Sequence, residues 1–199
     1  MSLFFRAAML AAFLPAATQA AECALEAYDP QIGEVIELDL GGEIPVSVKL
    51  GEDVVGVSQG FGALDLESVW SASLWPSRIL VSDINHDGKR ELWVGRGGAG
   101  SNAFYAMIGS VGPGMFFEAG PFADPDFCEV ERGFTTHLET SAGVTETWYD
   151  VNAMGQPWKA VEQKSIDGNM LLRTVYAEDG AVIQESTVPA DAPLVEAGL

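Results

Sequence analysis

Cations are scarce in this 199-residue chain, which has 10 Lys and Arg against 29 Asp and Glu and a formal net charge of −19. Nucleic acids and anionic membrane surfaces are bound through basic patches, so the charge argues against both as partners. It favours metal ions or basic proteins, because an acidic surface attracts and steers cations. An acidic protein that is only kept soluble by its charge has the same composition.

Long apolar runs are also missing. Residues 7–17 are apolar but too few to span a bilayer, which requires about 20 residues, and no later run reaches that length. This run follows Arg6 and precedes Thr18-Gln19-Ala20, where small residues suit a signal peptidase. Residues 1–20 are therefore predicted to be a cleaved signal peptide, and we expect a periplasmic or secreted protein without membrane insertion.

Cysteine is almost absent, with Cys23 and Cys128 alone. The acid Glu22 before Cys23 is unsuited to a lipid-attachment signal. Two cysteines in an oxidising compartment most simply pair, which would tie the N-terminus to the middle of the fold. Such a bridge contributes about 4 to 5 kcal/mol in the chain-entropy model for a loop of about 100 residues. Two buried free thiols remain the alternative.

The dominant pattern that is present is period-two alternation of apolar and polar residues, which is typical of half-buried antiparallel strands. Alternating stretches occupy residues 34–40, 44–50, 78–84, 91–95, 144–151 and 170–186. Asp167-Gly168 and Asp179-Gly180 predict hairpin turns. We therefore expect a single all-β domain over residues 21–187, built as an antiparallel meander, β-propeller-like sheets or barrel-like sheets. Residues 188–199 predict a flexible tail.

Oxygen donors alternate along the segment from Asp83 to Glu91. Hard cations such as calcium prefer oxygen ligands, and a short loop can offer them from alternate positions if it turns sharply. Gly88 permits the positive φ of such a turn. The predicted calcium ligands are the side chains of Asp83, Asn85, Asp87 and Glu91 and the main-chain carbonyl of Lys89.

Two further observations bear on this calcium loop. Its closely spaced acids would repel one another without a cation, although Asn, Asp and Gly also dominate turns that bind nothing. The flanking segments are strand-like, and Val94 stands where an EF-hand has its bidentate Glu. The loop is therefore not an EF-hand.

The glycine-rich segment 95–100 matches G-x-G-x-x-G, the pattern of dinucleotide-binding loops. Such a site needs a helix that begins at the last glycine, whereas Ser101-Asn102-Ala103-Phe104-Tyr105 leads into another strand-like stretch. The glycines instead allow a tightly turned, protruding loop. Phe104 and Tyr105 can equally begin the next strand, because aromatic residues are core residues first.

The unit RILVSDINHDGKRELWVG resembles the strand, D-x-N-x-D-G, strand element of FG-GAP and VCBS-type calcium-loop proteins. With GRGGAGSNAFYAM, FFEAGPF and ETWYDV, residues 75–185 resemble periplasmic lysozyme inhibitors, namely inhibitors of invertebrate-type lysozymes and immunity proteins of killing systems. That family inserts an S-G-x-x-Y loop into the enzyme cleft. The resemblance implies partner-binding roles for Ser101, Asn102, Phe104 and Tyr105, with Asn102 in place of the glycine.

No set of residues forms a catalytic motif, so we expect a binding protein and not an enzyme. The leading hypothesis is a periplasmic calcium-binding inhibitor or immunity protein whose partner is a cationic peptidoglycan hydrolase. The alternative is a calcium-stabilised extracellular adhesion or scaffold module of FG-GAP type. A glycosidase that uses two of the many acids is a third, weaker reading.

Overall fold

The computed structural model describes residues 25–67, 79–128, 130 and 132–195. The predicted signal peptide and Cys23 lie outside these residues. Fifteen β-strands and no helix occur in the described part, which confirms the predicted all-β class. Those residues accordingly contain no helix long and apolar enough to cross a membrane.

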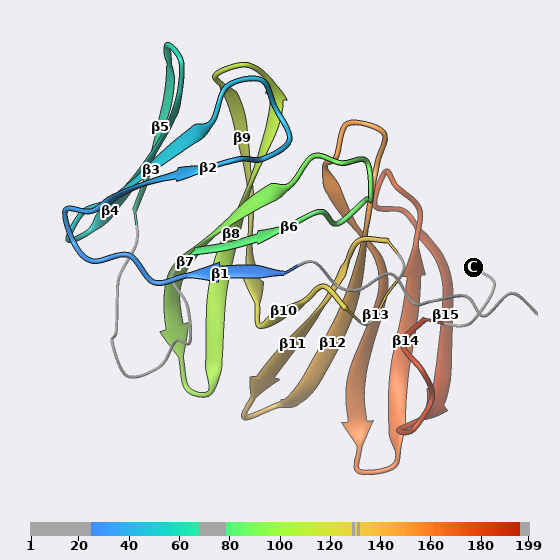
Figure 1. Ribbon diagram of the computed structural model, residues 1–199. Helices are drawn as coiled ribbons and strands as arrows, with labels where there is room; N and C mark the ends of the chain where they lie inside the picture. Colours follow the sequence, from blue (N-terminus) through green and yellow to red (C-terminus); the bar gives the residue numbers. More distant parts are fainter. Residues whose placement is uncertain (1–24, 68–78, 129, 131, 196–199) are drawn as a thin grey trace, which may run out of the picture.

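The strands form three antiparallel sheets (Figure 1). The four-stranded sheet has β2 (Val35–Leu38), β3 (Val46–Leu50), β4 (Val54–Gln59) and β5 (Gly62–Glu67) in sequential order. The five-stranded sheet is ordered β1 (Glu26–Tyr28), β6 (Ile79–Ser82), β7 (Glu91–Ala99), β8 (Asn102–Gly112) and β9 (Met115–Ala123). The six-stranded sheet runs through β10 (Pro125–Asp126), β11 (Phe134–Thr140), β12 (Gly143–Val151), β13 (Pro157–Asp167), β14 (Met170–Tyr176) and β15 (Val182–Pro189). Among the predicted arrangements, the antiparallel meander is the one observed, except that β1 pairs with β6 and not with β2.

The five-stranded sheet is central because both of its faces are buried. Successive side chains of a strand point to opposite faces, so each central strand supplies two cores. One core packs against the four-stranded sheet and includes Ile79, Val81, Leu92, Val94 and Ile108. The other packs against the six-stranded sheet and includes Leu80, Trp93, Tyr105, Met107, Phe122, Phe134 and Val151. β6 is thus buried at every residue, which alternation alone does not predict.

Trp93 is the centre of the second core. Its ring centroid lies 4.7 Å from that of Phe127, 4.8 Å from Phe134 and 5.8 Å from Phe122. Phe134 in turn stacks on Tyr149 at 5.0 Å. Edge-to-face and stacked aromatic pairs add to the free energy of simple area burial. This cluster packs the six-stranded sheet against the central one.

The C-terminal segment differs from the flexible tail predicted over residues 188–199. β15 extends to Pro189, and beyond it the main-chain oxygen of Pro193 accepts hydrogen bonds from Gln163 Nε2 (3.2 Å) and from the Arg173 guanidinium. Gln163 and Arg173 are buried, and buried polar groups require partners. The prediction is therefore wrong for residues 188–193.

Cys128 is disulfide-bonded. Its predicted partner Cys23 lies outside the described residues, so the Cys23 to Cys128 pairing stays a prediction. Cys128 follows the short strand β10 and its main-chain N–H donates to Asp126 Oδ1 at 2.8 Å. A bridge at this point would brace the segment between the central and the six-stranded sheet.

We expect Phe134→Ala to lower the free energy of unfolding by about 3 to 5 kcal/mol, because it opens a cavity in the aromatic cluster. Phe134 is fully buried, whereas Phe61 is fully exposed and serves as the matched control. Urea unfolding followed by tryptophan fluorescence measures both. Equal losses in Phe134→Ala and Phe61→Ala would contradict the assigned core.

Candidate functional site

The acidic loop from Asp83 to Glu91 joins β6 to β7. Its turn uses positive φ at His86 (57°) and at Gly88 (81°). The Asp83 carboxylate accepts hydrogen bonds from the main-chain N–H of Asp87 (3.2 Å) and of Gly88 (2.9 Å). The first acid of the segment thus folds the chain around itself, as short polar side chains do in turns.

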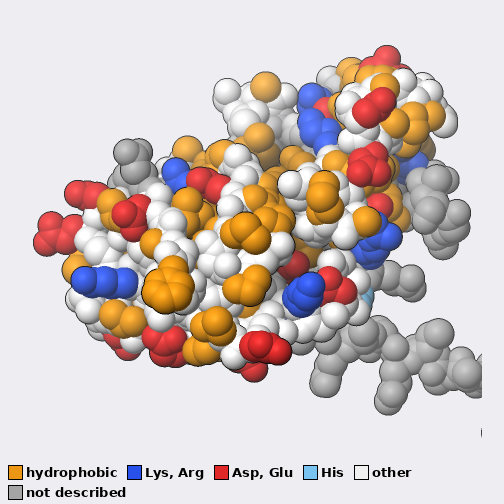
Figure 2. Space-filling view, turned by 90° about the horizontal axis from the view of Figure 1, so that it is seen from above, with side chains coloured by type: hydrophobic (Ala, Val, Ile, Leu, Met, Phe, Trp, Pro, Cys, Tyr) orange, Lys and Arg blue, Asp and Glu red, His pale blue; other side chains and the backbone are white. Residues whose placement is uncertain are grey.

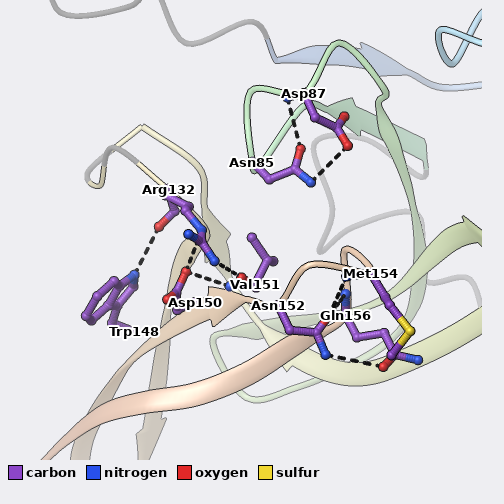
Figure 3. A network of polar contacts seen from close by, with 9 residues as sticks. All are labelled: Asn85, Asp87, Arg132, Trp148, Asp150, Val151, Asn152, Met154 and Gln156. Carbon is purple, nitrogen blue, oxygen red and sulfur yellow. Dashed lines mark hydrogen bonds and ion pairs between the residues drawn. The ribbon is translucent and has the colours of Figure 1, made fainter. Parts of the chain in front are cut away.

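Further hydrogen bonds order the other side chains of this acidic loop. Asn85 Nδ2 donates to Asp87 Oδ2 at 3.2 Å (Figure 3). Asp87 Oδ1 accepts from the N–H of Lys89 at 2.8 Å. Within the described chain, no three acidic, His or Cys side chains converge closely enough to hold a metal ion as they stand. The donor set itself is all oxygen, which suits calcium, and a rotation of the Asn85 amide would present its oxygen.

Glu91 is the buried acid of the acidic loop, with 7% of its surface exposed. Its Oε2 accepts a hydrogen bond from the N–H of Ile84 at 3.1 Å. Burial raises the pKa of Glu91 to about 7, the charges of Asp83 and Asp87 add to the rise, and the Ile84 hydrogen bond opposes it. No Lys, Arg or His of the described residues forms an ion pair with it. The carboxylate therefore lacks a compensating cation.

The acidic loop contacts all three sheets. The carbonyl of Ile84 accepts from the N–H of Gly133 (2.6 Å), next to β11 of the six-stranded sheet. The N–H of Arg90 donates to the carbonyl of Leu40 (3.0 Å), in the segment that links β2 to β3. The Arg90 guanidinium pairs with Glu26 of β1 at 2.6 Å. A cation bound in this loop would act on the junction of the sheets.

The glycine-rich segment forms the opposite end of β7. Ala99 pairs with Asn102, so Gly100 and Ser101 make a two-residue hairpin turn, with Gly100 at a φ of 64°. The hairpin of β7 and β8 continues as strand, which supports the exclusion of a dinucleotide site. We define the hairpin tip as residues 98–101. All four are exposed, and none has a side chain larger than that of Ser101.

Asn102 fixes this hairpin tip to the six-stranded sheet. Its Nδ2 donates to the carbonyls of Glu139 (2.8 Å) and Ala99 (3.1 Å), and its Oδ1 accepts from the N–H of Glu139 (2.8 Å). Ser101 Oγ adds a hydrogen bond to Glu139 Oε2 at 3.0 Å. The β7–β8 and β11–β12 hairpins accordingly lie side by side (Figure 1). Sequence reasoning did not foresee the role of Glu139, because nothing local signals this contact.

The structure separates the four predicted partner-binding residues. Ser101 is exposed at the tip, whereas Asn102 and Tyr105 are buried, with 5% and 4% of their surfaces exposed. Phe104 is half-buried in β8. Tyr105 belongs to the aromatic core, and its burial raises the pKa of its hydroxyl to about 12. A plug that inserts Tyr105 into a partner does not fit this geometry, because β8 alternates and turns Tyr105 inward.

No family model matches the chain, and it has no significant match among curated proteins or solved structures.

The raised pKa of Glu91 predicts how the free energy of unfolding of the metal-free protein depends on pH. Its folded pKa of about 7 lies above the ordinary 4.5, so between these values the folded state holds the extra proton. The free energy of unfolding should therefore fall as pH rises through this window, by up to roughly 3 kcal/mol. Urea unfolding in chelator at pH 5, 6, 7 and 8 measures it.

Glu91→Gln is the matched variant for that pH series. The substitution should flatten the decline in the free energy of unfolding between pH 5 and 7. It should leave the pH dependence below pH 5 unchanged. Glu162, whose pKa is lowered, loses its contribution only below that window. Parallel curves for wild type and variant would rule out Glu91 as the titrating group.

Proposed function

We propose that the protein is an exported, calcium-stabilised inhibitor of peptidoglycan hydrolases that presents its hairpin tip to the cleft of the enzyme. The observation that carries the proposal is the clamp formed by Asn102 on the main chain of Glu139. A loop already held in one conformation loses little entropy on binding, which favours tight association. The proposed contact region is thus the tip itself and not Tyr105.

The shape and chemistry of the hairpin tip suit a narrow, polar cleft. Its side chains are small, so the hairpin is thin enough to enter a groove that accommodates a glycan chain. The Ser101 hydroxyl donates its one proton to Glu139, so it can accept a hydrogen bond from the protonated member of the paired carboxyl groups that glycan hydrolases use. The Glu139 carboxylate beside it, 3.0 Å from Ser101 Oγ, suits a basic cleft rim.

Three features of the chain favour a hydrolase as the partner. A net charge of −19 steers a cationic enzyme toward the protein. The resemblance of residues 75–185 to lysozyme inhibitors points to the same class. The predicted signal peptide would deliver the protein to the compartment that contains peptidoglycan.

Calcium is proposed to act at a distance from the hairpin tip. Its ligands would be Asp83, Asn85, Asp87, the Lys89 carbonyl and Glu91, at the start of β7. The tip lies at the other end of that strand, about 25 Å away at the usual rise per residue. Calcium would therefore neutralise the acidic loop and fasten the junction of three sheets, without touching the partner.

We expect calcium to raise the melting temperature of the mature protein by several degrees, because it binds only the folded loop. Asp87→Ala should remove most of this shift, whereas Asp53→Ala, an exposed acid between β3 and β4, should retain it. Differential scanning calorimetry with calcium and with chelator measures both. An equal shift in the two variants would refute the calcium loop.

The inhibition proposal is tested by Ala99→Trp, which places a bulky ring on the exposed hairpin tip and should weaken inhibition at least tenfold. Ala181→Trp, at the exposed turn between β14 and β15, is the matched control and should inhibit like wild type. The assay mixes each protein with hydrolases of several lysozyme classes. No inhibition of any class by wild type would overturn the proposal and favour an adhesion or scaffold module.

A further inference from the structure

A cavity of about 510 Å³ lies where four connecting segments meet. They are the β2–β3 link, the acidic loop, the β8–β9 turn and the β12–β13 turn. These segments lie along the upper side of the molecule in Figure 1, and Figure 2 looks down on that side, where hydrophobic side chains gather among charged ones. The volume falls in the range of about 300 to 1,000 Å³ typical of small-molecule sites.

One part of the cavity is apolar. Ile44, Val111 and Met154 line it from three different segments, and Phe117 lines it as well. The first three are exposed although they are large and hydrophobic. Exposed apolar side chains that converge from separate segments mark a binding surface more often than single scattered ones do.

The other part of the cavity is acidic. Asp87 and the buried Glu91 line it. Of the two nearby cations, Arg90 is engaged by Glu26 at 2.6 Å and by the carbonyl of Asp39, which leaves Lys89 at the exposed rim. The charge at this end is negative, and the Glu91 carboxylate has no cation of its own among the described residues.

The walls of the cavity are held in place before any ligand arrives. Buried Gln59 ties two of them, since its Nε2 donates to the carbonyl of Ile44 (2.6 Å) and its Oε1 accepts from the N–H of Gly114 (3.0 Å). Asn152 orders a third, because its Oδ1 accepts from the N–H of Met154 and of Gln156, each at 3.0 Å (Figure 3). Preformed walls are typical of small-molecule sites.

We infer that this cavity binds a small organic cation, in which a primary ammonium group is carried on an apolar chain. The ammonium meets Glu91 and Asp87, and the chain lies along Ile44, Val111 and Met154. The inference does not rest on the proposed inhibition, because the cavity and the hairpin tip lie at opposite ends of β7. It shares Asp87 and Glu91 with the proposed calcium loop, so its test excludes calcium.

Isothermal titration calorimetry of the mature protein in chelator at pH 8 measures binding of n-hexylammonium. n-Hexanol has the same chain without the charge and should bind at least about tenfold more weakly, because a hydrogen bond to a charged group is lost. This comparison uses wild type alone, so it does not depend on how any variant folds. No binding of hexylammonium, or equal binding of hexanol, would overturn the inference.

Two substitutions then locate the site. Glu91→Gln should weaken hexylammonium about tenfold and leave hexanol unchanged. Val111→Ser should weaken both ligands severalfold, whereas Val182→Ser, at a residue of the same 55% exposure on β15, should change neither. Full affinity for hexylammonium in Glu91→Gln or Val111→Ser, or an equal loss in Val182→Ser, would place the ligand elsewhere and refute the site.

Discussion

Burial of β7 on both faces is the constraint on which the other features of the molecule depend. Leu92 and Val94 point into the core shared with the four-stranded sheet, and Trp93 points into the core shared with the six-stranded sheet. A strand packed in this way cannot slip by one residue without exchanging its two faces. Packing therefore fixes the end of β7 at the acidic loop, whereas the exposed end at the hairpin tip is held by the hydrogen bonds of Asn102.

The acidic loop places several carboxylates, which repel one another, at the junction of three sheets. Asp83 and Asp87 are ordered by main-chain N–H groups, but Glu91 is buried, pairs with no cation among the residues that the structure describes, and has its pKa raised to about 7. A buried charge that destabilises the fold is tolerated where it serves binding. The Glu91 carboxylate belongs to the proposed calcium loop and also lines the cavity. Calcium binding, ligand binding and the stability of the fold would therefore all depend on this one group.

The hairpin tip contains no cluster of acids and is ordered in a different way from the acidic loop. Its side chains are small and its main chain is held by the Asn102 amide, so order comes from hydrogen bonds and not from packing. Such a tip is rigid yet thin. If it enters an enzyme cleft as proposed, the buried Tyr105 contributes by anchoring β8 in the core and not by touching the target.

The sequence by itself determined the strands and the acidic loop, because their signals are local. Period-two alternation, Asp-Gly turns and the spacing from Asp83 to Glu91 depend only on neighbouring residues. Tertiary structure alone decided which faces were covered: alternation defines two faces of β8 but does not tell that both are buried, so Asn102 and Tyr105 turn from contact residues into structural ones. Tertiary structure also decided the hydrogen bonds of Pro193 and the cavity around Met154, because both form where segments distant in the chain meet.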